Sequence, residues 1–242
     1  MSEKLVILGG GESGIGSAVL GVKQGFDVFV SDAGTIAQEV QKELNQLGVS
    51  FEEGGHDLDV ILKASLVMKS PGIPDHIDLI QQIRSSDIKI VSEIEFASQY
   101  TDATLIGITG SNGKTTTTLL THHLLKESGL NVGVAGNIGY SFARQVAESD
   151  REVYVLEISS FQLDDIHKFQ PEVAVITNIT PDHLDRYQNN FSKYIASKMR
   201  IIENQTTNQF LVFNAEDPWI WSLWFSNPLF IFNSKSSKTA FL

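Results

Sequence analysis

The chain has 242 residues, of which 42% are hydrophobic and 19% charged, which is ordinary for a soluble globular protein and suits one large domain or two of average size. The formal net charge of −11 argues against a general attraction to nucleic acid or anionic membranes, so any anionic ligand must be attracted by local features. The lack of cysteine excludes disulfides, thiolate catalysis and cysteine–zinc sites, and favours magnesium or manganese as the metal.

The start of the chain shows no secretory leader, because a strand-like run begins at Lys4 without a long apolar core before a small-residue cleavage site. No apolar run approaches the ~20 residues that span a bilayer. We therefore expect a cytoplasmic protein that binds neither membranes nor nucleic acid.

The first part of the chain alternates between apolar, strand-like runs and helical stretches. Strands are predicted at residues 4–8, 27–32, 65–74 and 88–93. A helix after the first strand should stop at Gly25, and an amphipathic helix over residues 35–48 should end at Gly48. Strands separated by such helices predict a parallel sheet with helices on both faces.

The strand–helix rhythm restarts near residues 97–103. Strands are predicted at residues 104–109, 131–136, 152–159, 172–177, 209–214 and 228–233, and helices at 115–128, 140–148 and 191–203. Because strands are still predicted close to the last residue, we expect the second sheet to be incomplete. The sequence thus predicts an α/β protein with a Rossmann-like domain over residues 1–98 and an incomplete P-loop-type ATPase domain over residues 99–242.

The stretch LIGITGSNGKTTTT (residues 105–118) reads as a strand, a glycine turn and the start of a helix. Gly107, Gly110 and Gly113 are three residues apart, so the strict phosphate-loop spacing is not met. The physical requirements are still met, because glycines let backbone amides turn toward a phosphate, and the helix start adds partial positive charge. Lys114 would reach the outer phosphates, and the Thr115 hydroxyl would bind Mg²⁺.

A second glycine turn, VILGGGESGIG (residues 6–16), also follows a strand, and Asp32 ends the next strand. This pattern fits NAD, any other nucleotide diphosphate, or a tight turn with no ligand. Glu12 lies inside the turn, and its negative charge would oppose a bound anion. We therefore expect its side chain to point away from the ligand.

Acidic and basic candidates follow later strands. Glu157 ends an apolar run, where folds of this kind hold magnesium, although it is also a normal residue for a helix start. His183 lies in an acid-rich turn past the next strand and is a candidate ligand of a second metal. Lys198 lies on a helix, where spacing alone fits a solvent-exposed lysine as well as a functional one.

Six segments together resemble the Mur ligases of peptidoglycan synthesis: GITGSNGKTTT, AGNIG, LEISSFQLD, NITPDHLDRY, ASKMRI and NAEDP. The opening ILGGGESG and the segment SPGI resemble the branch of that family that adds D-glutamate to UDP-N-acetylmuramoyl-L-alanine. The resemblance covers essentially the whole chain. It implies two phosphate-binding turns because there are two phosphorylated ligands, the UDP of the substrate and ATP.

The resemblance also implies roles for individual residues. ATP would be bound by Gly110, Ser111, Asn112, Gly113, Lys114, Thr115 and Thr116. The catalytic residues would be Lys114, Glu157, His183 and Lys198. Two metal ions would be held by Thr115, Glu157, His183 and Lys198. Lys198 matches a lysine that the family carbamylates. The UDP-sugar would be bound by Ser13, Gly14, Asp32, Gly72, Asn137, Ser159 and Gln162.

Two departures qualify the resemblance. The stretch Asp32–Ala33–Gly34 lacks the hydroxyl and basic residues that can follow this aspartate in relatives, so uridine contacts must partly differ. The family has a third, C-terminal domain that binds the incoming amino acid, and we expect no counterpart of it within these 242 residues. We therefore expect a truncated monomer that uses ATP with Mg²⁺ or Mn²⁺ and is inactive alone.

The resemblance implies an ADP-forming amide-bond ligase that works through an acyl phosphate. Two alternatives stay open on the sequence. One is a non-catalytic UDP-sugar-binding fragment, and the other is an NAD-dependent oxidoreductase that uses the first glycine turn.

Overall fold

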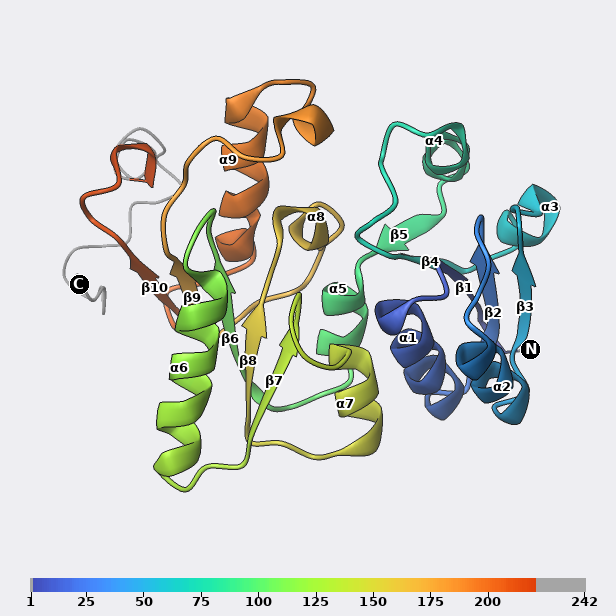
Figure 1. Ribbon diagram of the computed structural model, residues 1–242, viewed down its shortest axis with the longest axis horizontal. Helices are drawn as coiled ribbons and strands as arrows, with labels where there is room; N and C mark the ends of the chain where they lie inside the picture. Colours follow the sequence, from blue (N-terminus) through green and yellow to red (C-terminus); the bar gives the residue numbers. More distant parts are fainter. Residues whose placement is uncertain (1, 221–242) are drawn as a thin grey trace. The chain divides into compact units, whose positions relative to one another are not determined.

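The computed structural model describes residues 2–220 and divides the chain into two compact units, each built on one parallel sheet (Figure 1). The first unit comprises Met1–Thr101, Tyr140–Asp150 and Asp165–His167. The second comprises Asp102–Gly139, Arg151–Asp164 and Lys168–Leu242. The division expected between residues 98 and 99 stays a prediction. The α/β class with two parallel sheets is confirmed.

The first sheet has the strand order β3-β2-β1-β4-β5, with every described pair parallel. Its strands are β1 (Lys4–Leu8), β2 (Asp27–Asp32), β3 (Ser50–Glu53), β4 (Leu66–Lys69) and β5 (Lys89–Val91). The helices between them are α1 (Glu12–Lys23), α2 (Gln38–Gln46), α3 (Leu58–Ile61) and α4 (Asp78–Ser85), and α5 (Glu93–Ser98) follows β5. The central strand, β1, is apolar and buried from Leu5 to Leu8 because a parallel sheet is covered on both faces.

Strand β1 divides its side chains between the two faces of this sheet. Val6 and Leu8 belong to a core cluster with residues of α3 and α4. On the other face, α1 approaches very closely, since a Cβ at Gly21 would lie 2.8 Å from Leu5 Cδ2. Helix α7 (Phe142–Glu148) also belongs to the first unit, where it packs against α1 and α5.

The second sheet has the order β10-β9-β6-β8-β7, again parallel. Its strands are β6 (Thr104–Thr109), β7 (Val132–Gly136), β8 (Val153–Glu157), β9 (Val173–Ile176) and β10 (Phe210–Phe213). The helical segments of this unit are α6 (Lys114–Glu127), α8 (Ser160–Leu163), η1 (Leu184–Tyr187), α9 (Phe191–Met199) and η2 (Arg200–Ile202). Helix α6 packs Leu125 against one face, and Ile201 approaches Gly107 on the other.

Most predicted elements are confirmed, with informative exceptions. The run over residues 88–93 is a strand only as far as Val91, because Ser92 caps α5 by accepting a hydrogen bond from Glu95 N (3.3 Å). The edge strand β3 was not predicted, since SFEE lacks a clear apolar pattern. The strand predicted at residues 228–233 lies outside the described residues.

Helix α6 differs from a typical amphipathic helix. Leu119, Leu120 and Leu124 are 48%, 55% and 60% exposed, and only Thr118 of this helix is buried. No helix in the described part of the chain is both long and apolar enough to cross a bilayer.

A network of charged side chains lies at the carboxyl end of β4. Lys69 Nζ contacts Asp165 Oδ2 (2.9 Å) and Asp75 Oδ1 (2.6 Å), and Arg84 contacts the same two acids. Lys69 and Asp165 are almost fully buried, whereas Arg84 is 41% exposed. The Lys69 ammonium therefore compensates the negative charge of the buried Asp165 carboxylate. Through Asp75 it also holds the turn that follows β4.

We predict that Lys69→Met destabilises the chain by about 3 kcal/mol, because removal of one partner leaves a buried charge poorly compensated. Urea unfolding would measure the loss. Arg84→Ala is the matched control and should cost clearly less, since Lys69 still pairs with Asp165. Equal losses for the two variants would contradict the burial argument.

Candidate functional site

The central glycine turn connects β6 to α6 and needs glycine at two positions. Gly110 and Gly113 have φ of 145° and 82°, a region that side chains disfavour. A Cβ at Gly110 would lie 1.9 Å from Thr177 Oγ1, so the turn passes against the segment after β9. The predicted strand, turn and helix context of this motif is confirmed.

The turn is fastened by hydrogen bonds on one side. Asn178 accepts from the amides of Ser111 (2.9 Å, at its backbone oxygen) and Asn112 (3.0 Å, at Oδ1). These two amides, expected to bind phosphate, are used internally in this structure. Helix α6 begins at Lys114, so the backbone amides of its first turn have no helical carbonyl group before them to accept their hydrogen bonds. Gly113, at the N-cap, has no side chain that could accept them instead. These amides are the donors that an anion would meet.

Lys114 lies over the same turn. Its Nζ donates to the carbonyl oxygens of Gly110 and Ser111, both at 2.9 Å. The ammonium is thus held at the mouth of the turn. Thr115 and Thr116 follow at the exposed helix start.

Glu157 ends β8, the strand beside β6, and is 2% exposed. Asn137 follows the neighbouring strand β7 and forms two hydrogen bonds with Glu157. Its backbone amide donates to Glu157 O (2.7 Å), and its Nδ2 donates to Glu157 Oε1 (2.9 Å). The other carboxylate oxygen, Oε2, is buried and has no hydrogen-bond partner among the described residues. An unpartnered buried carboxylate oxygen is what a cation ligand requires.

Lys198 lies on α9 and is 2% exposed. Its Nζ lies 4.8 Å from the centre of the Tyr194 ring. Its pKa is lowered to about 7, mainly by burial and also by the nearby positive charge of Lys114, while Asp182 and Asp164 partly oppose the shift. The structure therefore brings Lys198 and Lys114 within electrostatic reach of each other.

Tyr194 is a supporting residue that the sequence analysis missed. Its hydroxyl lies 3.0 Å from Ser111 Oγ in the phosphate turn, and its ring covers the Lys198 ammonium. The available signal was its spacing, since residues four apart share one face of a helix.

His183 lies in the turn after β9, and its side chain is 56% exposed, unlike the buried Glu157 and Lys198. Its backbone is left-handed, with φ of 48°, and its ring lies 5.3 Å from that of Phe161. Its Nε2 is 3.5 Å from Asp182 Oδ2. The imidazole is accessible to a ligand that reaches this end of the sheet.

A metal site is not preassembled from protein groups alone. Among residues 2–220, no three or more His, Asp or Glu side chains are grouped to hold an ion. The free oxygen of Glu157 and the hydroxyl of Thr115 nevertheless fit Mg²⁺, which keeps water and phosphate oxygens among its ligands.

Ser159 and Gln162 start α8 and are engaged with each other. Ser159 Oγ accepts from the Gln162 amide (3.3 Å), and Gln162 Oε1 accepts from the Ser159 amide (3.0 Å). This is a capping box, and Gln162 is 1% exposed. Their predicted contact with the substrate stays a prediction.

The first glycine turn is equally constrained. A Cβ at Gly14 would lie 1.9 Å from Gly9 O, so α1 can start here only with glycine. Asp32 Oδ2 accepts from the Gly10 amide and Oδ1 from the Gly34 amide, both at 2.7 Å. Gly72 is exposed in the turn after β4. Because the strand order reverses at β1 and β4, these turns flank the crevice where such sheets bind ligands.

Glu12 points away from that turn, as expected. Its Oε1 accepts a hydrogen bond from the Ser141 amide at the start of α7 (3.0 Å).

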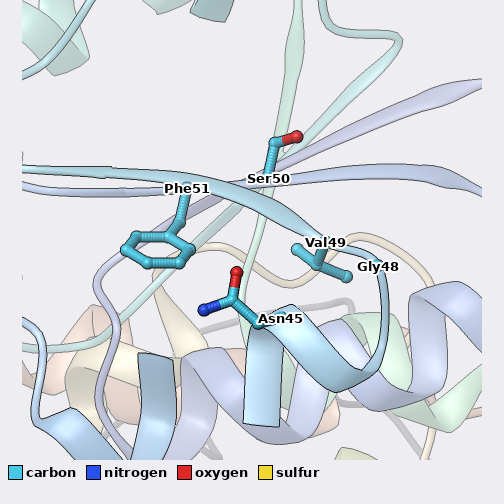
Figure 2. A pocket seen from close by; sticks show the side chains of 5 residues that line it. All are labelled: Asn45, Gly48, Val49, Ser50 and Phe51. Carbon is cyan, nitrogen blue, oxygen red and sulfur yellow. The ribbon is translucent and has the colours of Figure 1, made fainter. Parts of the chain in front are cut away.

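A separate hollow of about 390 Å³ lies between the end of α2 and the start of β3 (Figure 2). Phe51 points toward Asn45, while Ser50 points to the opposite side of the strand. The hollow lies where β3 begins, at the amino ends of the parallel strands, whereas the glycine turns follow the carboxyl ends of their strands. It is not part of the candidate site.

Comparison with known families agrees with the motifs. The model of the Mur ligase middle domain matches residues 108–239, and that of the MurD-like N-terminal domain of Mur ligases matches residues 3–92. The chain belongs to the Mur ligase family.

Relatives within the Mur ligases are close in sequence. The chain is 52% identical to a UDP-N-acetylmuramoylalanine–D-glutamate ligase of Christiangramia forsetii, over 95% of the chain and 52% of that protein. It is 53% identical to the protein of the same name from Cytophaga hutchinsonii, over 90% of the chain and 49% of that protein. The chain therefore spans about half the length of these curated relatives.

Solved Mur ligase structures share the fold. One is UDP-N-acetylmuramate:L-alanyl-gamma-D-glutamyl-meso-diaminopimelate ligase from Neisseria meningitides, with a TM-score of 0.64 and 20% identity over 94% of this chain and 76% of that chain. Another is UDP-N-acetylmuramate-alanine ligase MurC from Thermotoga maritima, with a TM-score of 0.56 and 24% identity over 91% of this chain and 51% of that chain.

We predict that the Lys198 amine titrates near pH 7, so that it is an ammonium below this value and a neutral amine above it. NMR of chain labelled at lysine ¹³Cε would show one resonance with this midpoint, absent in Lys198→Met. A midpoint for Lys198 near the ordinary 10.5 would contradict the effect of burial.

Proposed function

We propose that this chain supplies the UDP-sugar-binding and ATP-binding domains of an ATP-dependent ligase that adds D-glutamate to UDP-N-acetylmuramoyl-L-alanine. The observation that carries the proposal is the buried oxygen Oε2 of Glu157, on the strand beside the phosphate turn, which has no hydrogen-bond partner within residues 2–220. The names and sequences of the relatives support the choice of substrate. Residues 1–98 would bind the UDP-sugar, and residues 99–242 would bind ATP.

In the proposed reaction, the alanyl carboxylate attacks the γ-phosphate of ATP in line, giving an acyl phosphate and ADP. The amine of D-glutamate then attacks the activated carbonyl, and phosphate leaves. The first step brings an anion toward a polyphosphate, so stabilisation of negative charge is its main requirement. No general base is needed for it.

The residues of the second unit match that requirement. Lys114 would exchange its two carbonyl partners for outer phosphate oxygens, and the free first-turn amides of α6 would donate to the same phosphates. Bound Mg²⁺, held by Thr115 and Glu157, would neutralise phosphate charge. Asn137 orients the Glu157 carboxylate through Oε1.

Lys198 fits a second role. A neutral amine reacts with CO₂ to form a carbamate and release a proton, and a pKa of about 7 makes that amine available at neutral pH. The carbamate and His183 would hold a second metal ion. Modification would also replace a buried positive charge near Lys114 with a negative one.

The remaining parts of the proposal follow the relatives. D-Glutamate would be bound by residues outside this chain, which spans about half of their length. The protein would act as a monomer in the cytoplasm, with Mn²⁺ able to replace Mg²⁺, and this chain alone would bind ligands without turnover. The comparisons do not favour the oxidoreductase alternative.

We predict that Lys114→Ala abolishes acyl-phosphate formation in the complete enzyme and weakens binding of ATP with Mg²⁺ to this chain by roughly tenfold or more, because a charge-assisted contact to phosphate is lost. Calorimetry would measure binding. Lys126→Ala, an exposed position on the same helix, is the matched control and should bind normally. Near-normal ADP release by Lys114→Ala would refute the assignment.

A further inference from the structure

Two carboxylates from different helices meet at the start of α7. Glu12, the first residue of α1, accepts from the Ser141 amide (3.0 Å). Glu93, the first residue of α5, accepts through Oε1 from Ser141 Oγ (2.5 Å) and from the Ala143 amide (3.1 Å). Ser141 also caps α7 by accepting from the Arg144 amide (3.1 Å). One serine therefore joins three helices.

Glu93 is fully buried, and its Oε2 has no hydrogen-bond partner among the described residues. Burial raises its pKa, and hydrogen bonds from Ser13 and Ser141 only partly oppose the shift. Ser13 lies next to Glu12 in the first glycine turn. The buried acid is thus connected both to that turn and to α7.

The packing leaves little freedom at this junction. A Cβ at Gly16 would lie 1.8 Å from Ser141 Oγ and 3.2 Å from Arg144 Cβ. The first turn of α1 therefore lies directly against the start of α7. A displacement of Ser141 would be transmitted to α1 by contact as well as by hydrogen bonds.

The junction also explains how an acid is tolerated in the first glycine turn. An ionised Glu12 beside a diphosphate would weaken binding by repulsion between like charges. The start of α7 offers a backbone donor and the favourable end of a helix dipole, so the carboxylate is held there instead.

On the basis of the proposed function, we propose that Glu12 and Glu93 are positioning residues for the diphosphate of the UDP-sugar. By tying Glu12 and Ser13 to the start of α7, they hold the first turn of α1 in the shape that binds the diphosphate and keep the Glu12 charge away from the ligand. Neither carboxylate touches the ligand.

The test is calorimetric titration of this chain with UDP, comparing alanine and glutamine variants at both positions. Glutamine keeps an acceptor oxygen and alanine does not. We expect Glu12→Ala and Glu93→Ala to weaken UDP binding roughly tenfold or more, as for loss of a hydrogen bond to a charged group. Glu12→Gln and Glu93→Gln should bind within about threefold of the unaltered chain, since a factor of three is small on this scale.

Glu43→Gln is the matched control. Glu43, on α2, forms a two-point ion pair with Arg144 of α7 (2.7 and 3.1 Å), and among the described residues its carboxylate has no hydrogen bond or ion pair with the glycine turn. This variant should bind UDP normally. Titration with ATP and Mg²⁺ should give the same affinity for every variant, which reports that the second unit is intact.

The outcomes separate the two hypotheses. If the unaltered chain fails to bind UDP, the proposed function fails. If it binds and both alanine variants bind equally well, or if Glu43→Gln loses as much affinity, the positioning role is overturned. Simple charge repulsion predicts that Glu12→Ala and Glu12→Gln both bind more tightly, and that result would also overturn it. Because Glu12 is exposed, its variants keep the test valid even if Glu93→Ala does not fold.

Discussion

Parallel pairing of β6, β7, β8 and β9 places the carboxyl ends of all four strands at one edge of the second sheet. Four parts of the candidate site follow from that constraint. The phosphate turn continues β6, Asn137 continues β7, Glu157 ends β8, and the segment leading to His183 continues β9. Residues distant in sequence thus become neighbours because helices return each strand to the same direction.

The first unit uses the same principle with different chemistry. Its strand order reverses at β1, so the turns after β1 and β4 flank a crevice. Here the anchoring groups are acids: Asp32 holds two loop amides, and Glu12 and Glu93 hold the start of α7. In a chain with a net charge of −11, these three carboxylates are engaged by amide and hydroxyl donors of the protein itself.

Local patterns predicted much of this arrangement. The glycine turns and the strands before them could be inferred because each depends on residues close in sequence. That Glu12 points away from the first turn was inferred from charge repulsion, but its partner Ser141, far away in the sequence, could not be. Strand β3 was missed because its short sequence has no clear alternation, and the start of α5 was misjudged because Ser92 ended a strand that apolar residues had begun. The contact of Tyr194 with Ser111 and the Lys69–Asp165 pair join distant segments, which no local pattern reveals. Likewise, the bonds from Ser111 and Asn112 to Asn178 could be seen only in the folded chain.

The position of Lys114 has a consequence for nucleotide exchange. Its ammonium already rests on two carbonyl oxygens of its own turn, so much of the cost of removing water from it is met during folding. In the proposed function, a phosphate group would replace these neutral acceptors with charged ones and would meet an ammonium that is already in position. The side chain that holds the turn would therefore also be the one that binds the nucleotide.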